Sequence, residues 1–364
     1  MQSAHQNSSE KLENSRLFDS FLKEGAVLQT GSDSYKLFLG PFADSTASDC
    51  MQDLLYKPDF WDFTKKQSSG LSLLKAYKIV DLNRQEFVEL VSEASSGEIN
   101  SQIEWLPADK SAFQIQFDWL KTKIKESKIS KGLPITEQIG KNFKSISKLQ
   151  ILKNILQKNS EQYVYGFWDQ SAGFLGYTPE MLLQSAGQQF STMALAGTWS
   201  KQDDVIPDFT DVKTQNEHQI VVQDILKQLS EEKLISKSET TTLELEYLFH
   251  LRTNFIFQTK NIQSCIQKLH PTAALGIYPR STDLFLEFQT LDLQNRRKNF
   301  GAPFGITGPG QNFIVVGIRN IYWDKDQVSI YSGCGVTADS DFETEWNELS
   351  AKRNSVKKTL GLNL

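Results

Sequence analysis

Residues 333–353 read GCGVTADSDFETEWNELSAKR, and the interpretation of the whole chain starts from this stretch. A Gly-Cys-Gly turn opens it, and a helical segment follows. Within that segment Glu345, Glu348 and Lys352 fall at i, i+3 and i+7, so their side chains project from one face of the helix. Such a triplet usually forms a solvated surface, but two carboxylates on one face also suit a hard cation. What precedes the helix decides between the two interpretations.

A β-hairpin is predicted immediately before this helix. Residues 313–323 (FIVVGIRNIYW) and 328–332 (VSIYS) are β-rich runs separated by the polar turn Asp-Lys-Asp-Gln. Folding the chain on that turn places Arg319 opposite Ser332 and Gly333. A guanidinium matches the geometry of a carboxylate, and exposed glycine N–H groups also bind anions. Together with the acids of the helix, these groups indicate a site for a polycarboxylate that is held partly through a metal.

Two local patterns predict where helices begin. Ser340, followed three residues later by Glu343, has the spacing of a capping box. Thr178 and Pro179 suit the N-cap and the first position of another helix. That helix would carry Glu180 in its first turn, where the macrodipole favours a carboxylate. For Glu180 alone, an ordinary glutamate at a helix start is the default interpretation.

The sequence around Glu217 indicates a functional role more strongly than the sequence around Lys131 does. Lys131 follows an amphipathic helix predicted over residues 113–128, and a lysine at such a helix end normally sits in water. Glu217 lies one turn before an apolar stripe within residues 221–229, where an acid is costly unless it is paired or bound to a metal. His218 points about 100° away from Glu217 on a helical wheel and is predicted to be peripheral.

The composition indicates a soluble, cytoplasmic globular protein. The 364 residues are 39% hydrophobic, enough to bury a substantial core, and the net charge of −5 offers no basic surface for nucleic acid. Three cysteines without paired spacing argue against a disulfide framework or a zinc cluster. No apolar run approaches the roughly 20 residues that span a membrane. Residues 1–15 are polar and lack a signal-peptide core, so we expect a loose N-terminus and a single domain over residues 16–364.

The motifs resemble, in order, those of the chorismate-utilising enzymes. In that family a strand ending in Ile-Arg is followed by Gly-Ala-Gly, Asp-Ser and Glu-Trp-x-Glu-x-x-x-Lys; here the same pieces read GIRN, GCG, ADSD and EWNELSAK. Four upstream segments resemble further family motifs: ALAGT (194–198), DVKTQNEHQIVV (211–222), LHPTAALGIYP (269–279) and NFGAPFG (299–305). The resemblance covers about residues 113–364. It implies an α+β fold in which two large, mostly antiparallel sheets pack as a sandwich with helices outside.

The resemblance also implies a chorismate site that contains Mg²⁺. It makes Glu217 and Glu348 the metal ligands, with Glu345 close by, and the metal would hold the ring carboxylate. Arg319 and the backbone near Gly333 would hold the pyruvyl carboxylate. The remaining substrate-binding residues implied by the family are Gly197, Thr198, His250 and Lys352.

Three positions distinguish the reactions within the family. The aminodeoxychorismate synthases carry a nucleophilic lysine where this chain has Ala196, and the anthranilate synthases usually carry glutamine where it has Lys131. Isochorismate synthases have a lysine at the Lys131 position, which activates water as a general base. They have a glutamic acid at the Glu180 position, which protonates the departing C4 hydroxyl as a general acid. The resemblance therefore implies attack of water on C2 of chorismate, and water chemistry needs no glutaminase partner.

Three alternatives stay open at this point. A salicylate synthase would use the same lysine and then eliminate pyruvate, an anthranilate synthase-like enzyme would use ammonia, and a weakened homologue would only bind chorismate or a protein partner. Four departures from the family motifs leave these alternatives open. They are Trp199-Ser-Lys-Gln for Arg-x-Arg-Gly, Ile277 for glycine, Cys334 for alanine, and Pro134, which confines its strand to an edge or a bulge. Menaquinone, siderophore and salicylate synthesis are all possible destinations of isochorismate, and oligomeric state has no signature in the sequence.

Overall fold

The protein is described by a computed structural model. The described residues are 16–46, 52–65, 72–94, 102–141, 146–158, 161–201 and 211–364. The predicted loose N-terminus (1–15) and most of the altered loop after Thr198 lie outside these ranges. Among the residues described, no helix is long and apolar enough to cross a membrane.

Seventeen strands in the described part of the chain hydrogen-bond into one network, and each of its pairings is antiparallel. The network begins with β12 (Lys233–Lys237) and β13 (Thr241–Glu244), which both pair with β14 (Leu248–Gln258), and continues through β11 (Gln189–Ser200), β10 (Met181–Ala186), β17 (Phe313–Val316) and β16 (Pro303–Thr307). It then runs through β3 (Leu54–Tyr56), β4 (Leu73–Asn83), β2 (Ser34–Ser45), β1 (Gly25–Gly31), β8 (Tyr163–Trp168) and β9 (Gly173–Thr178). The last strands are β18 (Asn320–Trp323), β19 (Val328–Gly333), β7 (Ile135–Lys141) and β5 (Glu104–Trp105).

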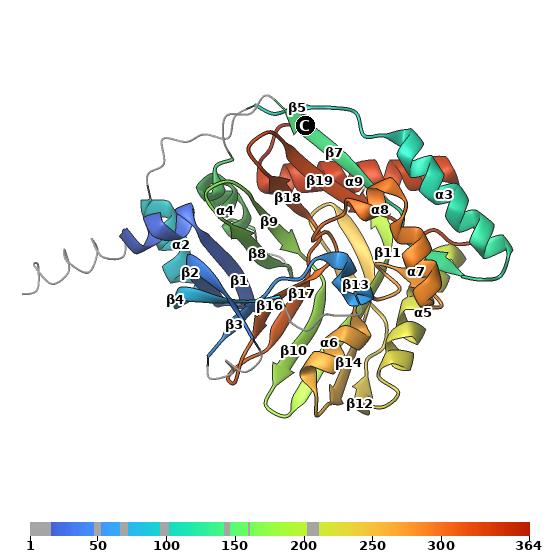
Figure 1. The fold of residues 1–364 in the computed structure, drawn as a ribbon, viewed down its shortest axis with the longest axis horizontal. Coiled ribbons are helices and arrows are strands. Elements are labelled where there is room, and N and C mark those ends of the chain that lie inside the picture. The colour runs from blue at the N-terminus through green and yellow to red at the C-terminus, as the bar shows by residue number, and fades with distance from the viewer. Residues whose placement is uncertain are drawn as a thin grey trace, which may run out of the picture.

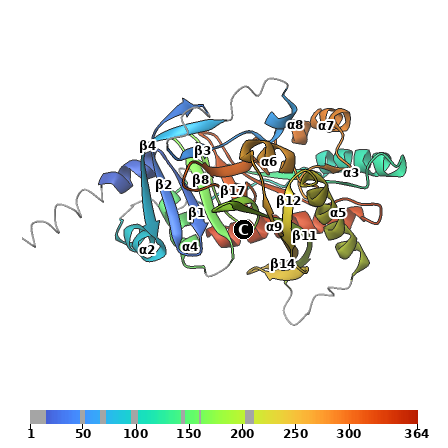
Figure 2. The same cartoon turned by 90° about the horizontal axis from the view of Figure 1, so that it is seen from below.

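Helices cover the outside of this network (Figure 1). Residues 16–23 are helical, and the further α-helices of the described ranges are α2 (Arg84–Glu93), α3 (Lys110–Lys125), α4 (Lys148–Leu156), α5 (Val212–Gln228), α6 (Ile262–Leu269), α7 (Thr282–Gln289), α8 (Asp292–Asn295) and α9 (Phe342–Leu360). Two views show α2 and α4 toward one end of the molecule and α3, α5 and α7 toward the other (Figures 1 and 2). Helix α5 packs on β11 and α9 packs on β19. The predicted α+β class, with large antiparallel sheets and external helices, is confirmed.

The two halves of the strand network meet where the chain crosses from one to the other. Residues 179–180 connect β9 to β10, and residues 317–319 connect β17 to β18. Because β9 pairs with β18 and β10 pairs with β17, the two connections run side by side. The Val316 N–H donates to the Glu180 carbonyl at 2.9 Å, and the Tyr177 N–H donates to the Arg319 carbonyl at 3.2 Å. The fold therefore places Glu180 and Arg319 next to each other in the middle of the molecule.

The helix predicted to begin at Thr178 and Pro179 does not form. Thr178 ends β9 instead, and β10 begins at Met181 and pairs with β17. The Thr-Pro-Glu pattern resembles a helix start locally, but the strand pairing on both sides overrides it. The predicted strand over residues 313–323 is likewise divided, because Arg319 has a positive φ of 60° that interrupts the ladder between β17 and β18.

Helix α9 confirms the predicted C-terminal helix, but its cap differs from the prediction. Asp341 is the N-cap, and its carboxylate accepts a hydrogen bond from the Thr344 N–H. Ser340 instead accepts from the Thr337 N–H at 3.1 Å, which closes the turn before the helix. Aspartate and serine are comparable N-caps, so the spacing of Ser340 and Glu343 alone could not separate the two.

Candidate active site

A pocket opens beside the two crossing connections. Its polar lining consists of Lys131, Glu180, Thr198, Glu217, His250, Arg319, Ser332 and Lys352, together with backbone at Gly197, Gly333 and Gly335. Nine of the eleven predicted site residues are in this lining, although they come from eight separate parts of the chain. The other two, Glu345 and Glu348, lie nearby on α9 and are described below with the carboxylate cluster.

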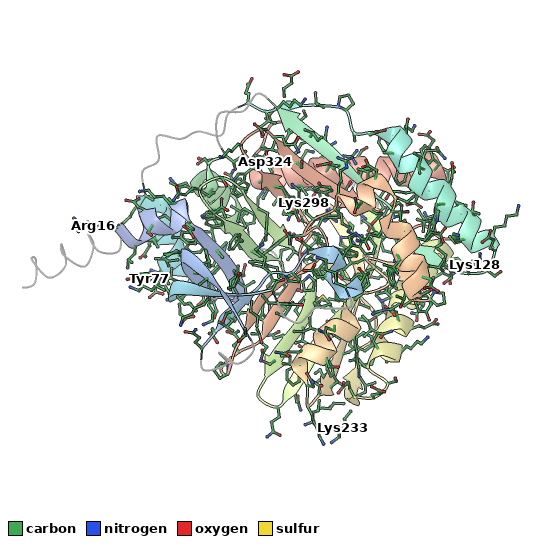
Figure 3. All side chains as sticks on the ribbon, in the orientation of Figure 1. Arg16, Tyr77, Lys128, Lys233, Lys298 and Asp324 are labelled. Carbon is green, nitrogen blue, oxygen red and sulfur yellow. The ribbon has the colours of Figure 1, made fainter. Side chains whose placement is uncertain are left out.

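Lys131 is buried, contrary to the default interpretation of a solvated lysine at a helix end. Only 1% of its side chain is exposed, whereas Lys128, three residues earlier, extends outward at the edge of the molecule (Figure 3). The cause is the short strand β6 (Lys131–Gly132), which pairs with β15 (Ile277–Tyr278) and turns the chain inward. The Lys131 ammonium then lies 3.1 Å from the Glu217 carboxylate. Ile277, one of the departures from the family motif, is therefore part of the backbone pairing that holds Lys131.

Glu180 is a buried carboxyl that keeps its proton. Burial raises its pKa to about 8, against the opposing influence of the nearby positive charges of Lys131, Lys352 and Arg319. Removing water penalises the ionised form more strongly than these cations favour it. At neutral pH most molecules consequently hold a neutral Glu180 that can donate a proton in the pocket.

Arg319 is oriented by a short chain of hydrogen bonds. One guanidinium nitrogen, Nη2, lies 3.3 Å from Nε2 of His250, and Nδ1 of His250 lies 3.2 Å from the Thr198 hydroxyl. Burial and the Arg319 charge hold the pKa of His250 well below its usual range, so the imidazole is neutral. Because an arginine can only donate, Nε2 must accept and Nδ1 carries the proton. The second nitrogen of Arg319, Nη1, is buried and has no hydrogen-bond partner among the described residues, which leaves it available to a ligand carboxylate.

Gly333, Gly335 and Lys352 also line the pocket. The Lys352 ammonium donates to the Gly333 carbonyl at 2.9 Å and pairs with Glu348 at 2.6 Å. At Gly335 a β-carbon would lie 2.0 Å from a Glu217 carboxylate oxygen and 2.6 Å from the Lys131 side chain. The absent side chain at Gly335 therefore makes room for the ion pair between Lys131 and Glu217. Gly335 was not among the predicted site residues, although it belongs to the Gly-Cys-Gly motif.

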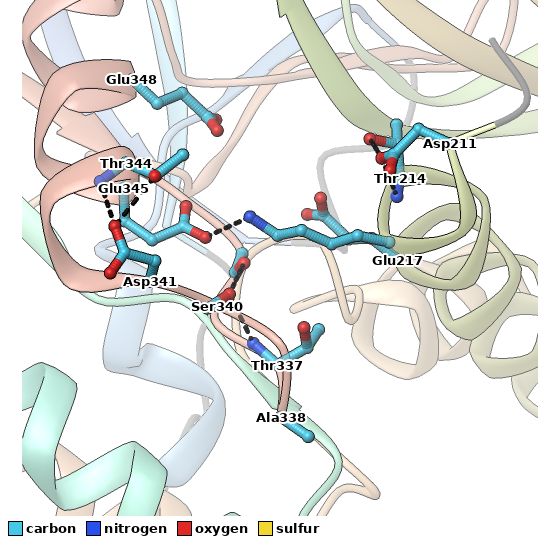
Figure 4. A network of polar contacts seen from close by, with 12 residues as sticks. Asp211, Thr214, Glu217, Thr337, Ala338, Ser340, Asp341, Thr344, Glu345 and Glu348 are labelled. Atoms are coloured by element: carbon cyan, nitrogen blue, oxygen red, sulfur yellow. Dashed lines mark hydrogen bonds and ion pairs between the residues drawn. The ribbon is translucent and has the colours of Figure 1, made fainter. Parts of the chain in front are cut away.

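The three predicted metal ligands face one another between α5 and α9. Glu345 and Glu348 project from α9 toward α5, and Glu217 projects from α5 toward α9 (Figure 4). Within the described ranges no three histidine, cysteine or acidic side chains are already close enough to hold a metal ion. Each carboxylate is instead paired with a lysine, and Glu345 pairs with Lys213 of α5 at 2.5 Å. Three carboxylates from two helices around cationic groups fit the oxygen-donor chemistry of Mg²⁺.

A known protein family matches most of this chain. The family model described as chorismate binding enzyme matches residues 71–361. The chain belongs to this family. It is similar to isochorismate synthase EntC of Escherichia coli K12 (28% identical over 229 residues, 58% of this chain and 57% of the relative) and to isochorismate synthase MenF of Bacillus subtilis (27% over 265 residues, 67% and 55%). It is also similar to the salicylate biosynthesis isochorismate synthase of Pseudomonas aeruginosa (27% over 230 residues, 59% and 48%).

These matches extend over about half the length of the curated relatives. Among solved structures, MenF of Escherichia coli has a TM-score of 0.76 at 20% identity, with 95% of this chain and 91% of that chain covered. A putative 2,3-dihydroxybenzoate-specific isochorismate synthase, DhbC of Bacillus anthracis, has a TM-score of 0.75 at 19% identity, with 96% and 100% covered. At these identities the likeness is one of fold.

Some residues in and around this pocket were missed or misplaced by sequence reasoning. His218 is buried rather than peripheral, and its Nε2 lies 2.8 Å from the Thr253 hydroxyl. The face of α5 that packs on the sheet is broader than the apolar stripe, so it includes His218 while Glu217 lies at its edge. Lys213 was present in the DVKTQNEH motif but was given no role. The apolar lining that was also missed consists of Leu133, Leu195, Ala274, Leu275, Phe300, Ile318, Tyr331 and Val356.

Proposed function

We propose that this protein is an isochorismate synthase, which adds water at C2 of chorismate and removes the hydroxyl at C4. The observation that carries the proposal is the pair of Lys131 and Glu180, a buried lysine and a buried protonated carboxyl in the lining of one pocket. The reaction needs one group that accepts a proton and one that donates a proton. The names of the curated relatives support the same reaction class.

In the proposed reaction, Lys131 in its neutral form removes a proton from a water molecule as the water oxygen bonds to C2. The ring double bonds shift, and the bond between C4 and its hydroxyl oxygen breaks. Glu180 gives its proton to that oxygen, which leaves as water. One water is consumed and one is released, so chorismate and isochorismate are isomers and no oxidant or ammonia is required.

Separate groups of the site are assigned to the two carboxylates of chorismate. The free Nη1 of Arg319 and the backbone at Gly333 are proposed to bind the pyruvyl carboxylate. His250 and Thr198 hold Arg319 in place, so they act on this carboxylate through the guanidinium. Gly197 has a positive φ of 76°, and a β-carbon there would lie 2.5 Å from the Thr214 side chain, so the strand can pass close to α5 only with glycine.

The cluster of Glu217, Glu345 and Glu348 is proposed to hold Mg²⁺. When bound, the metal would neutralise and orient the ring carboxylate of chorismate. Lys352, which bonds to both Glu348 and Gly333, links this cluster to the pyruvyl end of the site. We further propose that residues 16–364 act as one chorismate-binding domain on a free small molecule, without a glutaminase partner.

Product analysis tests the proposal. Purified protein is incubated with chorismate and Mg²⁺ in a buffer without ammonia, and the products are separated by chromatography. Isochorismate is the expected main product. Salicylate released together with pyruvate would assign the chain to the salicylate synthases instead, and turnover only after ammonia is added would show that the role given to Lys131 is wrong.

A further inference from the structure

Lys213 occupies an electrostatically unfavourable position unless something nearby compensates it. Helix α5 begins at Val212 with Asp211 as its N-cap, so Lys213 lies in the first turn. The amide groups at a helix N-terminus carry partial positive charge, which disfavours a cation there. The Lys213 side chain reaches across to α9 and donates a hydrogen bond to Glu345 at 2.5 Å. The carboxylates of α9 therefore hold this lysine in place.

All three carboxylates of the cluster act on the Lys213 ammonium. The hydrogen bond that Lys213 donates to Glu345, together with the negative charges of Glu345, Glu348 and Glu217, stabilises the ammonium and outweighs the cost of its partial burial. Glu345 and Glu348 lie one turn apart on the same face of α9, so the two acids repel each other. A cation between the helices relieves this repulsion. In this structure the ammonium of Lys213 is that cation.

The other two lysines of the cluster differ from Lys213 in their surroundings. Lys131 and Lys352 line the substrate pocket, and their side chains are 1% and 14% exposed. Lys213 does not line the pocket, and 28% of its side chain is exposed. More of its side chain reaches solvent, so rotation of this flexible side chain can carry the ammonium into water. Lys131 and Lys352 are less exposed and face the substrate pocket instead.

We propose that the Lys213 ammonium is an internal placeholder, which neutralises the cluster of Glu217, Glu345 and Glu348 until a divalent cation enters and displaces it. The inference rests on the metal site of the proposed function. A buried carboxylate such as Glu345 is costly without a positive partner. A divalent ion and an ammonium repel each other strongly when they share the same carboxylate, so occupation by the two is exclusive.

Calorimetric titration of Mg²⁺ into the purified protein, without chorismate, tests this competition. The variants are Lys213→Met, Lys213→Gln and, as a control on the same helix, Lys227→Met, whose side chain is exposed. Removing one neighbouring positive charge lowers the dissociation constant of a bound cation by roughly tenfold or more. Both Lys213 variants should therefore bind Mg²⁺ at least that much more tightly than the wild type. Lys227→Met should bind like the wild type. Lys213→Gln keeps a hydrogen-bond donor for Glu345 and serves if the methionine variant does not fold.

Thermal unfolding supplies a second readout. With EDTA present, both Lys213 variants should unfold at a lower temperature than the wild type, because Glu345 has lost its cation, and Mg²⁺ should raise their unfolding temperature more than that of the wild type. Equal or weaker Mg²⁺ binding by the Lys213 variants would overturn the placeholder role and would show that Lys213 supports the metal site instead. Failure of the wild type and the variants alike to bind Mg²⁺ would overturn the metal assignment itself, and this inference with it. In that case the product analysis described above would still test the reaction separately.

Discussion

Replacing Glu180 with glutamine is expected to make the protein's stability less sensitive to pH. Glutamine has nearly the same volume as glutamic acid but cannot ionise. The pKa of Glu180 is raised from 4.5 to about 8 in the folded protein, chiefly by burial. Between these two values the folded state holds a proton that the unfolded chain has released. The stabilising contribution of protonated Glu180 is therefore complete below about pH 4.5 and is lost as the pH rises toward 8.

The size of the effect follows from the same two pKa values. Each pH unit above 4.5 costs about 1.4 kcal/mol, which amounts to roughly 3 kcal/mol at pH 7 and roughly 5 kcal/mol at pH 8 and above. Glu180→Gln removes this cost. The variant should thus gain stability relative to the wild type as the pH rises from 5 to 8.5, although it loses the proton donor. We expect its kcat to fall by about 10²- to 10⁴-fold, which is the usual contribution of a general acid.

Urea unfolding followed by tryptophan fluorescence at several pH values measures the difference. Glu239→Gln, at an exposed carboxylate, is the control and should follow the wild type at every pH. A difference in unfolding free energy between Glu180→Gln and the wild type that does not change from pH 5 to 8.5 would refute the reasoning. It would mean that Glu180 is ionised in the folded protein and cannot serve as the acid.

Three further substitutions test the other parts of the site. Lys131→Met should lower kcat by about 10²- to 10⁴-fold with little effect on KM, measured by steady-state kinetics, because it removes the base; an unchanged kcat would contradict the assignment. Arg319→Lys keeps the positive charge but loses the planar fork, so KM for chorismate should rise by about ten- to a hundredfold, and an unaltered KM would place the pyruvyl carboxylate elsewhere. Gly335→Ala would put a methyl group 2.0 Å from a Glu217 oxygen and should abolish turnover while circular dichroism shows a folded protein. Gly310→Ala, where the new methyl group meets nothing within 4 Å, is its control and should remain active.

Local sequence motifs predicted many of the residues that line the pocket. The spacing of Glu345, Glu348 and Lys352 predicted a shared helix face, and α9 has that face toward α5. Arg319 and Gly333 were predicted to lie opposite each other on the hairpin; both line the pocket, although the ladder between β18 and β19 pairs only Tyr322 and Trp323 with Ser329 and Val328. Local spacing is informative here because helix periodicity and strand direction determine which side chains point the same way.

What the sequence could not provide depends on contacts between distant segments. The burial of Lys131 results from pairing of β6 with β15, which lies about 145 residues further along the chain, and from the ion pair with Glu217. The position of Glu180 results from strand pairing on both sides of Pro179, which overrode a convincing local helix start. Lys213 is on a different helix from its partner Glu345, so no local spacing could connect the two. Tertiary contact supplied each of these placements.

The origin of the new hydroxyl oxygen tests the central claim most directly. Chorismate is incubated with the protein and Mg²⁺ in water enriched in ¹⁸O, and the product is examined by mass spectrometry at early times. If Lys131 activates a water molecule and Glu180 protonates the leaving hydroxyl, each isochorismate formed should contain one ¹⁸O at C2. Isochorismate without the label would show that the hydroxyl migrates within the substrate, and it would contradict the roles assigned to both residues.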